Sequence, residues 1–467
     1  METMRRKLLK AGACGILSHL LPMDSAFARD LSADPSRGAR NDPARDDPAG
    51  VAPKLVEIME TRAVHHHPQL GAYYTGYPDG LFTWETFFDN IVLLHAGETQ
   101  LGKGALAILL STQRPDGFIP RHWPGLAAPT GFGDVWSLYE SEEHAQPFLC
   151  QCALFLTRAN QGDIAWITEP MYDGLARYLA HWEAAWRRDS SGLCVWASAP
   201  HSGEDNQFDR AGVWRSYFCA GADLNSFLYL DYLAMARIAK AKGKTADAAL
   251  FEQSAAQKKA AIQSLLWDET DGFYYDRDAR TGKHLKIKSV AGFMPLWAGI
   301  ATEQQAKRLV EHLTNPKEFW SAYPVPSYAR SERNYTQHHV PPPLLDPYYG
   351  LDDDHSNWRG GAWGHTNYFI VHGLQLYGFD REARAIAEKS YAMSAPDMQI
   401  REWYNAETGA GSGGIGICAG AELLLRFLQA ELSAAFSPMP IEDASKPLSS
   451  DRVRAALGLT RRFRQKT

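Results

Sequence analysis

Residues 357–379 read NWRGGAWGHTNYFIVHGLQLYGF, and residues 401–409 read REWYNAETG. The first stretch opens with aromatic and polar residues and continues with the apolar spacing of a helix, and the second predicts a loop that presents Glu402. Tryptophan and tyrosine recur in both stretches. Aromatic faces stack on sugar rings, while a few fixed polar groups bind the hydroxyls. The two stretches therefore predict a carbohydrate site around which the fold is organised.

The composition is that of a globular protein. The chain has 467 residues, of which 45% are hydrophobic, so it can bury the core of one large domain or of several smaller ones. Its net charge of -6 lacks the basic character with which proteins bind phosphate backbones, so nucleic acid is not an expected partner. The sequence contains no phosphate-binding loop, dinucleotide fingerprint or serine nucleophile elbow, which disfavours phosphate transfer, redox and esterase chemistry.

The amino terminus predicts an export signal. Arg5 and Arg6 precede a modest apolar stretch, and Ala26-Phe27-Ala28 forms a cleavage site of small residues. The apolar stretch is shorter than the ~20 residues that a membrane-spanning helix needs. We therefore expect residues 1–28 to be a removable twin-arginine signal peptide, which predicts a periplasmic protein without a membrane anchor. Residues 29–52, rich in Asp, Arg, Pro and Gly, predict a flexible linker.

Apolar residues recur at helical spacing through most of the remaining chain. The predicted helices lie near residues 54–64, 85–95, 101–113, 144–160, 165–188, 222–242, 245–267, 288–299, 302–314, 363–378, 381–395 and 414–434. Several are paired through short turns, and Asp223 is the expected N-cap of the helix that begins near it. Helical hairpins in this number predict an all-α (α/α)6 barrel, whose loops at one rim build the site. An open solenoid is the alternative, but no stable repeat supports it.

The remaining segments are short or polar. The best strand candidates are WRSYF at residues 214–218 and GFYYD at residues 272–276. The predicted catalytic domain spans residues 53–436, and residues 437–467, which are rich in Pro and Ser and then basic, predict a loosely docked tail. Cysteines outside the signal are odd in number, so free thiols are expected.

Two carboxyl-bearing residues on separate stretches form the candidate catalytic pair. Glycosidic hydrolysis needs one carboxylic acid to protonate the leaving oxygen and one carboxylate to activate water, and inverting enzymes separate them by about 6.5–9.5 Å. Asp205 lies in the turn sequence SGEDN, where the nearby Trp196 and Trp214 are expected to raise its pKa, so it is the predicted acid. Glu402 is the predicted base. The alternatives are a turn-forming role for Asp205 and a surface ion pair for Glu402.

Ordered sequence blocks resemble glycoside hydrolase family 63. WRGGAW at residues 358–363, followed by Asn367-Tyr368, Gly373-Leu374 and YGF, resembles that family's W-R-G-P-x-W…N-Y…G-L…Y-G signature. Further blocks follow in the family's order, namely FTWETFF at residues 82–88, QRPDGFIP at 113–120, QP at 146–147, SGEDN at 202–206 (for S-G-M-D-N) and EWYNAETG at 402–409. The family includes bacterial α-glucosidases and the mannosylglycerate and glucosylglycerate hydrolases, and it is similar in fold to the family 37 trehalases.

The resemblance implies an (α/α)6 barrel and an inverting mechanism with Asp205 as general acid and Glu402 as general base. It implies no metal or organic cofactor. The predicted substrate-binding residues are Trp84, Glu85, Gln146, Trp358, Arg359, Trp363, Asn367 and Tyr404. Arg359 offers a planar fork of donors for sugar hydroxyls or a ligand carboxylate, and Trp84 offers a stacking face. The alternatives are core packing for Trp84 and Trp363 and an ion pair with Glu402 for Arg359.

Three departures from the family pattern affect the expected substrate more than the expected reaction. Glu85 stands where the family usually has Asp, and Gly361 replaces the Pro of R-G-P. Residues 410–420, AGSGGIGICAG, replace a segment that usually contains F-x-W, which removes an aromatic wall.

Several histidines and acidic residues are weaker candidates. The run Asp352-Asp353-Asp354-His355 offers oxygen ligands for calcium, with a solvated loop as the alternative. The run His65-His66-His67 has the composition of a metal site, but consecutive residues rarely face one ion. His122 and His144 are candidate donors to a sugar hydroxyl, with ordinary loop histidines as the alternative.

We therefore expect an exo-acting inverting glycoside hydrolase that removes a terminal α-linked sugar, glucose first, from a small saccharide or glycoside. The alternatives are a trehalase-like, glucosylglycerate or mannosylglycerate specificity, a catalytically inactive periplasmic sugar-binding barrel, and elimination on a uronic acid through a Tyr and a His. The sugar, the linkage, the aglycone and the oligomeric state stay open at this point.

Overall fold

The computed structural model describes residues 64–76, 80–95, 99–123, 143–184, 189, 191–213, 215–338, 356–396 and 400–415. Several predictions lie outside these residues. They are the signal peptide of residues 1–28, the linker of residues 29–52, the helix near residues 54–64 apart from Val64, the acidic run at residues 352–355 and the tail of residues 437–467.

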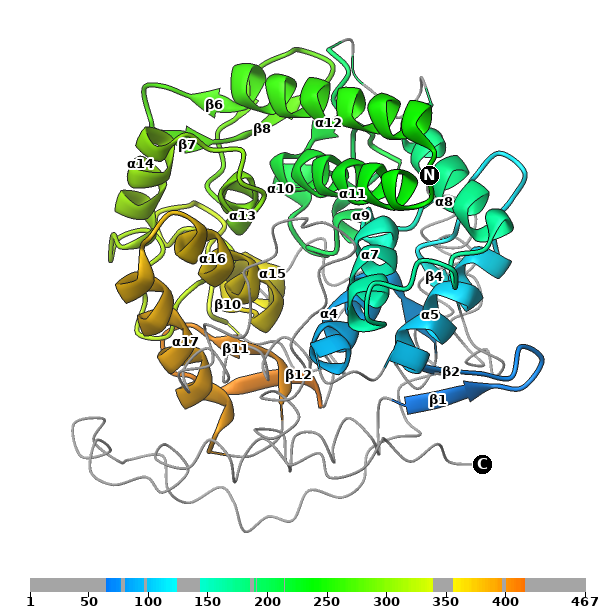
Figure 1. Cartoon of the computed structure of the whole chain (residues 1–467). Coiled ribbons are helices and arrows are strands. Elements are labelled where there is room, and N and C mark those ends of the chain that lie inside the picture. The colour runs from blue at the N-terminus through cyan, green and yellow to red at the C-terminus, as the bar shows by residue number, and fades with distance from the viewer. Residues whose placement is uncertain are drawn as a thin grey trace, which may run out of the picture.

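Helices form two curved layers, one inside the other (Figure 1). The inner layer consists of α4 (Thr83–His95), α7 (Leu149–Ala159), α11 (Ala222–Ala241), α13 (Met294–Trp297) and α16 (Gly364–Leu376). The outer layer consists of α5 (Thr99–Ser111), α8 (Glu169–Trp182), α12 (Thr245–Leu265), α14 (Glu303–Leu313) and α17 (Asp380–Ser394). Contacts run between the layers, as between α4 and α5, α11 and α12, or α16 and α17, and also between successive inner helices. The described helices are therefore arranged as hairpins around a common centre.

Burial distinguishes the two layers. In the inner helix α16 every residue from Gly364 to Leu374 is buried, whereas in the outer helix α12 only Ala248, Ala255, Lys258 and Ile262 are buried. A helix enclosed by protein is apolar on all sides, and a helix at the surface carries only one apolar stripe. The difference follows from the inner helices being covered by the outer ones.

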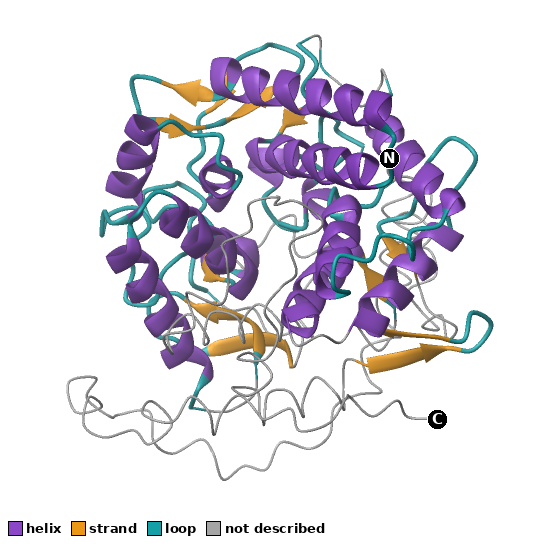
Figure 2. Cartoon of the chain, viewed as in Figure 1, coloured by secondary structure: helices purple, strands orange, loops and turns teal. Residues whose placement is uncertain are grey.

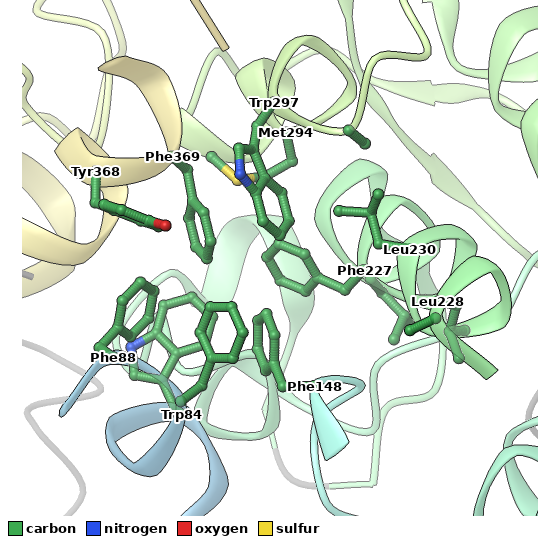
Figure 3. Close-up of a cluster of buried hydrophobic side chains, with 14 of the residues drawn as sticks. Trp84, Phe88, Phe148, Phe227, Leu228, Leu230, Met294, Trp297, Tyr368 and Phe369 are labelled. Carbon is green, nitrogen blue, oxygen red and sulfur yellow. The ribbon is translucent and has the colours of Figure 1, made fainter. Parts of the chain in front are cut away.

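Aromatic side chains fill the centre of the inner layer (Figure 3). Trp84 comes from α4, Phe148 from the residue before α7, Phe227 from α11, and Trp297 and Phe369 from α13 and α16. Ring centroids lie 4.7 Å apart for Phe148 and Phe227, and 4.3 Å apart for Trp297 and Phe369. Rings of this size bury large areas and prefer offset or edge contacts at such distances. The cluster therefore holds the inner helices together.

Short antiparallel strands and short helices connect the long helices (Figure 2). The strands are β1 (Val64–His67), β2 (Ala72–Thr75), β3 (Leu81–Phe82), β4 (His122–Trp123), β5 (Cys219–Ala220), β6 (Trp267–Asp268), β7 (Phe273–Tyr274), β8 (Asp276–Asp278), β9 (His284–Leu285), β10 (Gly361–Ala362), β11 (Arg401–Asn405) and β12 (Gly411–Ile415). The short helices are α9 (Ala199–Ser202), α10 (Phe208–Ala211), the 3-10 helix η6 (Val290–Phe293) and α15 (Asn357–Gly360).

Most predicted helices in the described residues are confirmed, with shifted ends. Helix α8 begins at Glu169 because Thr168 caps it and Pro170 suits its first turn. Helix α7 begins at Leu149 and not near residue 144, because His144 pairs with Pro120 in an extended bridge. The predicted helix at residues 288–299 is only η6 followed by α13, which are short elements. The four described cysteines are buried free thiols, as expected.

Three local predictions are wrong. Residues 215–218 are not a strand, because Arg215 and Tyr217 adopt positive φ. Asp223 is not the N-cap of α11; Gly221 occupies that position, and Asp223 binds another side chain from the first turn. Glu402 lies on the strand β11 and not on a loop. Of the helix predicted near residues 414–434 only residues 414–415 are described, and they belong to β12; the rest lies outside the described residues.

Candidate active site

A tight turn places Asp205 after the short helix α9. The hydroxyl of Ser198 accepts a hydrogen bond from the backbone N–H of His201 at 3.1 Å, which caps the helix. Gly203 ends the helix with a φ of 87°, a conformation that glycine adopts without a Cβ penalty. A Cβ at this position would lie only 3.0 Å from Gln146 Nε2. The conformation, and to a lesser degree the close approach of Gln146, therefore favour glycine directly before the Glu204-Asp205 pair.

The surroundings of Asp205 raise its pKa. Burial raises the pKa of Asp205 to about 7, Arg121 opposes the rise, and the nearby carboxylates of Glu402 and Glu143 add to it. The predicted direction of the pKa shift is thus confirmed, and its main cause is burial of the carboxyl group. The effect of Glu402 on this pKa also means that the structure brings the two predicted catalytic carboxyl groups into one electrostatic environment.

Arg121 and Glu143 form a buried ion pair beside this loop. Arg121 Nε lies 3.2 Å from Glu143 Oε2, and Ser198 Oγ donates to Glu143 Oε1 at 2.8 Å. Arg121 also donates to the carbonyl of Pro200. The pair therefore ties α9 to the segments that contain residues 121 and 143. Sequence reasoning missed both residues, because neither lies at a motif position that indicates its partner.

The loop that carries Asp205 is attached to the aromatic stretch. The N–H of Trp358 donates to Asn206 Oδ1 at 3.0 Å, and Gln207 Nε2 donates to the carbonyl of Trp358 at 2.7 Å. Two consecutive side chains thus hold both backbone groups of one residue about 150 positions away in the chain. The sequence predicts a shared site for these stretches, and the structure joins them by direct hydrogen bonds.

Three tryptophans form a layered wall next to that contact. The rings of Trp358 and Trp363 stack with centroids 3.8 Å apart at an angle of 8°, and Trp403 lies 6.5 Å from Trp363. All three are buried, and Trp363 Nε1 donates to the carbonyl of Asn357 at 3.2 Å. The faces that stack on each other are not available to a sugar, so this part of the wall supports the site from behind.

Glu402 is held by a three-stranded sheet. Strand β11 pairs with β10 through Gly361 and Ala362, so the WRGGAW block and the strand of Glu402 are directly hydrogen-bonded neighbours. On the other side β11 pairs with β12, where Gly413 has a φ of 74°. A Cβ at Gly413 would lie 2.5 Å from Glu402 Oε2, so the carboxylate occupies the space that a side chain would take. The departure at residues 410–420 thus supplies a glycine against which Glu402 lies.

Trp84 and Gln146 lie on the other side of Gly203. Trp84 is part of the buried aromatic cluster, which agrees with the core-packing alternative, although its ring also lies near the built Cβ position of Gly203, at 3.6 Å. Gln146 Nε2 donates to the carbonyl of His201 at 3.3 Å. Within the described residues, Trp84 Nε1 and Gln146 Oε1 are buried polar atoms without a hydrogen-bond partner. Such groups are stabilised when a ligand hydroxyl pairs with them.

The remaining predicted binding residues differ in what they contact. Asn367 uses its amide internally, donating to Pro324 O at 3.1 Å and to Ser390 Oγ at 2.9 Å, which indicates a structural role. Tyr404 is buried, and its hydroxyl accepts from Arg401 N at 3.0 Å. Arg359 is half-buried, and its Nε donates to the carbonyl of Asn334 at 3.0 Å. The side chain of Glu85 lies outside the described residues.

The histidine candidates differ in their surroundings. The ring nitrogens of His144 contact backbone groups of Ile119 and Tyr178, and burial lowers the pKa of His122 to about 3. The run His65-His66-His67 lies on β1. Across the described part of the chain no cluster of three or more His, Cys, Asp or Glu residues is arranged to bind a metal ion, and no helix there is long and apolar enough to span a bilayer.

Comparison with known protein families gives a match over most of the chain. Residues 77–416 match the family model described as the mannosylglycerate hydrolase MGH1-like glycoside hydrolase domain.

Curated relatives match shorter segments. The mannosylglycerate hydrolase of Thermus thermophilus is 30% identical over 164 residues, which are 34% of this chain and 34% of that protein. The mannosylglycerate hydrolase of Rubrobacter radiotolerans is 26% identical over 192 residues, 40% of this chain and 39% of that protein. The cytosolic neutral trehalase of Kluyveromyces lactis is 29% identical over 181 residues, 36% of this chain and 22% of that protein. The chain thus matches well under half of each relative's length.

Solved structures match over a larger part of the chain. The crystal structure of the family 63 mannosylglycerate hydrolase from Thermus thermophilus in complex with glucose superposes with a TM-score of 0.61 at 19% identity, over 81% of this chain and 99% of that chain. Neutral trehalase Nth1 from Saccharomyces cerevisiae gives a TM-score of 0.58 at 17% identity, over 87% of this chain and 85% of that chain. At these identities the likeness concerns the fold, and it confirms the predicted fold class.

Proposed function

We propose a function from the premise that this chain belongs to the mannosylglycerate hydrolase MGH1-like glycoside hydrolase family, within glycoside hydrolase family 63. The chain is a glycoside hydrolase, and we propose that it is an exo-acting, inverting enzyme that cleaves a terminal α-linked sugar from a small glycoside. The observation that carries the proposal is the half-buried Asp205 carboxyl group, whose pKa is raised to about 7 in an environment that includes Glu402.

In the proposed reaction the two carboxyl groups act on opposite sides of the bond. Asp205, protonated near neutral pH, gives its proton to the glycosidic oxygen as the bond to the anomeric carbon breaks. Glu402 takes a proton from a water molecule, whose oxygen attacks the anomeric carbon from the opposite face. An α-linked substrate then yields a β product. The proton taken by Glu402 and the proton lost by Asp205 are exchanged with solvent after product release.

The surroundings of Gly203 favour a glycone site. Trp84 and Gln146 both lie close to this glycine. Their buried polar atoms, Trp84 Nε1 and Gln146 Oε1, have no hydrogen-bond partner among the described residues. Leaving a buried polar group unpaired costs about 1–3 kcal/mol, so pairing with sugar hydroxyls is favourable there. The tryptophan layer of the WRGGAW block supports the site on the side of Glu402.

Within the α-glycosides we propose a glycoside of a small anionic aglycone such as glycerate, with mannose or glucose as the glycone. The curated relatives that match include two mannosylglycerate hydrolases, and one solved relative is described in complex with D-glycerate. Arg359, next to Trp358, is the candidate cation for the carboxylate because its planar guanidinium matches carboxylate geometry. Trehalose and neutral α-glucosides are the competing substrates.

A substrate panel followed by proton NMR tests this function. The panel contains mannosylglycerate, glucosylglycerate, trehalose, and the 4-nitrophenyl α-glucoside and α-mannoside, with the 4-nitrophenyl β-glucoside as the control. We expect hydrolysis of one α-glycoside with the β-anomer as the first product. A first product of α configuration contradicts the inverting mechanism. Saccharide binding by calorimetry with no product over days contradicts hydrolysis and supports a sugar-binding protein.

We also propose that residues 1–28 direct export to the periplasm, on the strength of the Arg5-Arg6 pair and the small residues at 26–28. Sequencing the amino terminus of the protein recovered from the periplasm is expected to begin after Ala28, and recovery of the uncleaved chain from the cytoplasm contradicts this.

A further inference from the structure

Arg210 is a fully buried arginine that contacts three carboxylates. It lies on α10, five residues after Asp205. Its Nη1 is 2.8 Å from Glu204 Oε2, its Nη2 is 2.6 Å from Asp223 Oδ2, and its Nε donates to Asp276 Oδ2. A buried charge is tolerated only when it is paired and hydrogen-bonded. Each of the three guanidinium nitrogens contacts one carboxylate, and we call these four residues the Arg210 cluster.

The partners of Arg210 are anchored in different elements. Asp223 lies in the first turn of the inner helix α11, and its Oδ1 accepts from Trp196 Nε1 at 2.9 Å. Asp276 begins β8, and its Oδ1 accepts from Ala222 N at 2.7 Å. One of these two carboxylates thus lies on the inner helix α11, and the other accepts a hydrogen bond from its first residue. Arg210 links the third partner, Glu204, to the start of this helix.

Glu204 directly precedes Asp205 in the chain. Its carboxylate is held by Arg210, whereas the side chains of Asn206 and Gln207 are held by the backbone of Trp358. The turn is therefore fixed immediately before and immediately after Asp205, from two different parts of the fold. Restricting both neighbours restricts the position of the Asp205 carboxyl group itself.

We propose that Arg210 is a positioning residue, which holds the general acid Asp205 in place through Glu204. The inference rests on the proposed function, since it assigns Arg210 a role in that reaction. The role proposed for Arg210 is geometric, and the charges that contribute most to the pKa of Asp205 are those of Arg121, Glu402 and Glu143. Glu204 stands where the family pattern S-G-M-D-N has Met, so this polar attachment is a feature of the present chain.

The protonation of the Arg210 cluster decides which variant is conservative. Three carboxylates around one guanidinium carry excess negative charge if all are ionised. Burial raises the pKa of Glu204, with Arg210 opposing the rise, and a glutamine at this position offers Arg210 the same acceptor oxygen without the charge. Glu204→Gln therefore keeps the contact with Arg210, and Glu204→Met removes it at similar side-chain length.

The functional test compares two leaving groups of the same sugar. Mannosylglycerate needs its leaving oxygen protonated, whereas α-mannosyl fluoride releases fluoride with little help from an acid; the glucosyl pair replaces them if the substrate panel selects glucose. Because a misplacement of about 1 Å costs on the order of 100-fold in rate, we expect Glu204→Met to lower kcat on the glycerate substrate by roughly 10- to 100-fold. We expect kcat on the fluoride and both KM values to change by less than about 3-fold, and Glu204→Gln to restore kcat.

Hydrogen exchange supplies a readout that does not need activity. In mass spectrometry the peptide covering residues 203–212 is expected to exchange faster in Glu204→Met and in Arg210→Lys, and at the wild-type rate in Glu204→Gln. The matched control is Glu318→Gln, which alters an ion pair with Lys288 and His312 near the outer helix α14 and is expected to change neither the exchange of this peptide nor the ratio between substrates.

The outcomes separate this proposal from the proposed function. Equal loss on both substrates in Glu204→Met, or unchanged exchange of the peptide, overturns the positioning role. A wild-type protein that hydrolyses neither substrate overturns the proposed function, and the exchange rates then still decide whether Arg210 and Glu204 fix the turn that carries Asp205.

Discussion

The loop that carries Asp205 and the sheet that carries Glu402 hold their carboxyl groups by different means. Around Asp205 the fold uses side chains, since Glu204 binds Arg210 and Asn206 and Gln207 bind the backbone of Trp358. Around Glu402 it uses the backbone, since β11 is paired on both edges and Gly413 leaves room for the carboxylate. The acid is therefore sensitive to side-chain substitutions at its neighbours, and the base is sensitive to changes of backbone and space.

Replacing each carboxyl group with its amide is expected to have the largest effect and to distinguish the roles of the two residues. Because general acid or base catalysis contributes roughly 100- to 10,000-fold, Asp205→Asn and Glu402→Gln are each expected to lower kcat on the glycerate glycoside by about that factor. On the glycosyl fluoride Asp205→Asn is expected to stay within about 10-fold of wild type, because fluoride needs little protonation, whereas Glu402→Gln loses activity on both substrates. Steady-state rates on both substrates check this, with circular dichroism to verify folding. Full activity of either variant on the glycerate substrate removes that residue from the catalytic pair.

The backbone dependence of Glu402 is tested by adding one methyl group. A Cβ at Gly413 would overlap Glu402 Oε2, so Gly413→Ala is expected to displace the carboxylate and lower kcat by on the order of 10- to 100-fold. Gly243→Ala is the matched control, because Gly243 has the same φ of 74° but no atom within 4 Å of its built Cβ. The control is expected to lose stability from backbone strain and to keep kcat. If both variants lose kcat equally, strain and not the contact with Glu402 explains the effect.

The raised pKa of Asp205 predicts smaller effects, which depend on pH. Since the acid must be protonated and its pKa is about 7, kcat/KM is expected to fall about tenfold per pH unit above pH 7. The folded pKa lies above the usual carboxyl value of 3.8, so the unfolded state binds fewer protons between those values and stability declines as pH rises from about 4 to 7. Asp205→Asn is therefore expected to raise Tm at pH 8 and to leave it nearly unchanged at pH 4. A pH profile without a descending limb between pH 6 and 8 contradicts the assigned pKa.

The helices were largely predictable from the sequence, because their signal is local. Periodicity indicated α11 and α12 to within two residues, and the glycine between them, Gly243, has the positive φ that such a turn needs. The strand of Glu402 was not predictable in the same way. Its pairing with β10 joins segments about 40 residues apart, and REWYN has no alternation that distinguishes a short strand from a loop.

The candidate catalytic pair came from ordered motifs, whereas its supporting residues did not. Asp205 and Glu402 lie in blocks whose order along the chain indicates a family. Arg121, Glu143 and Arg210 lie in no such block position, and in the sequence they look like ordinary surface charges. Their burial and pairing depend on which elements the fold brings against them.

By itself the sequence determined the helical fold class, the candidate catalytic pair and the kind of reaction to expect, because hydrophobic spacing and motif order are properties of the chain. Only the tertiary structure decided that Asn367 is used internally and that Asp223 binds Arg210 instead of capping its helix. It also decided that Glu402 lies against Gly413. The physical reason is that burial, and with it the free energy of a charge or a hydrogen bond, is set by contacts between residues far apart in the chain.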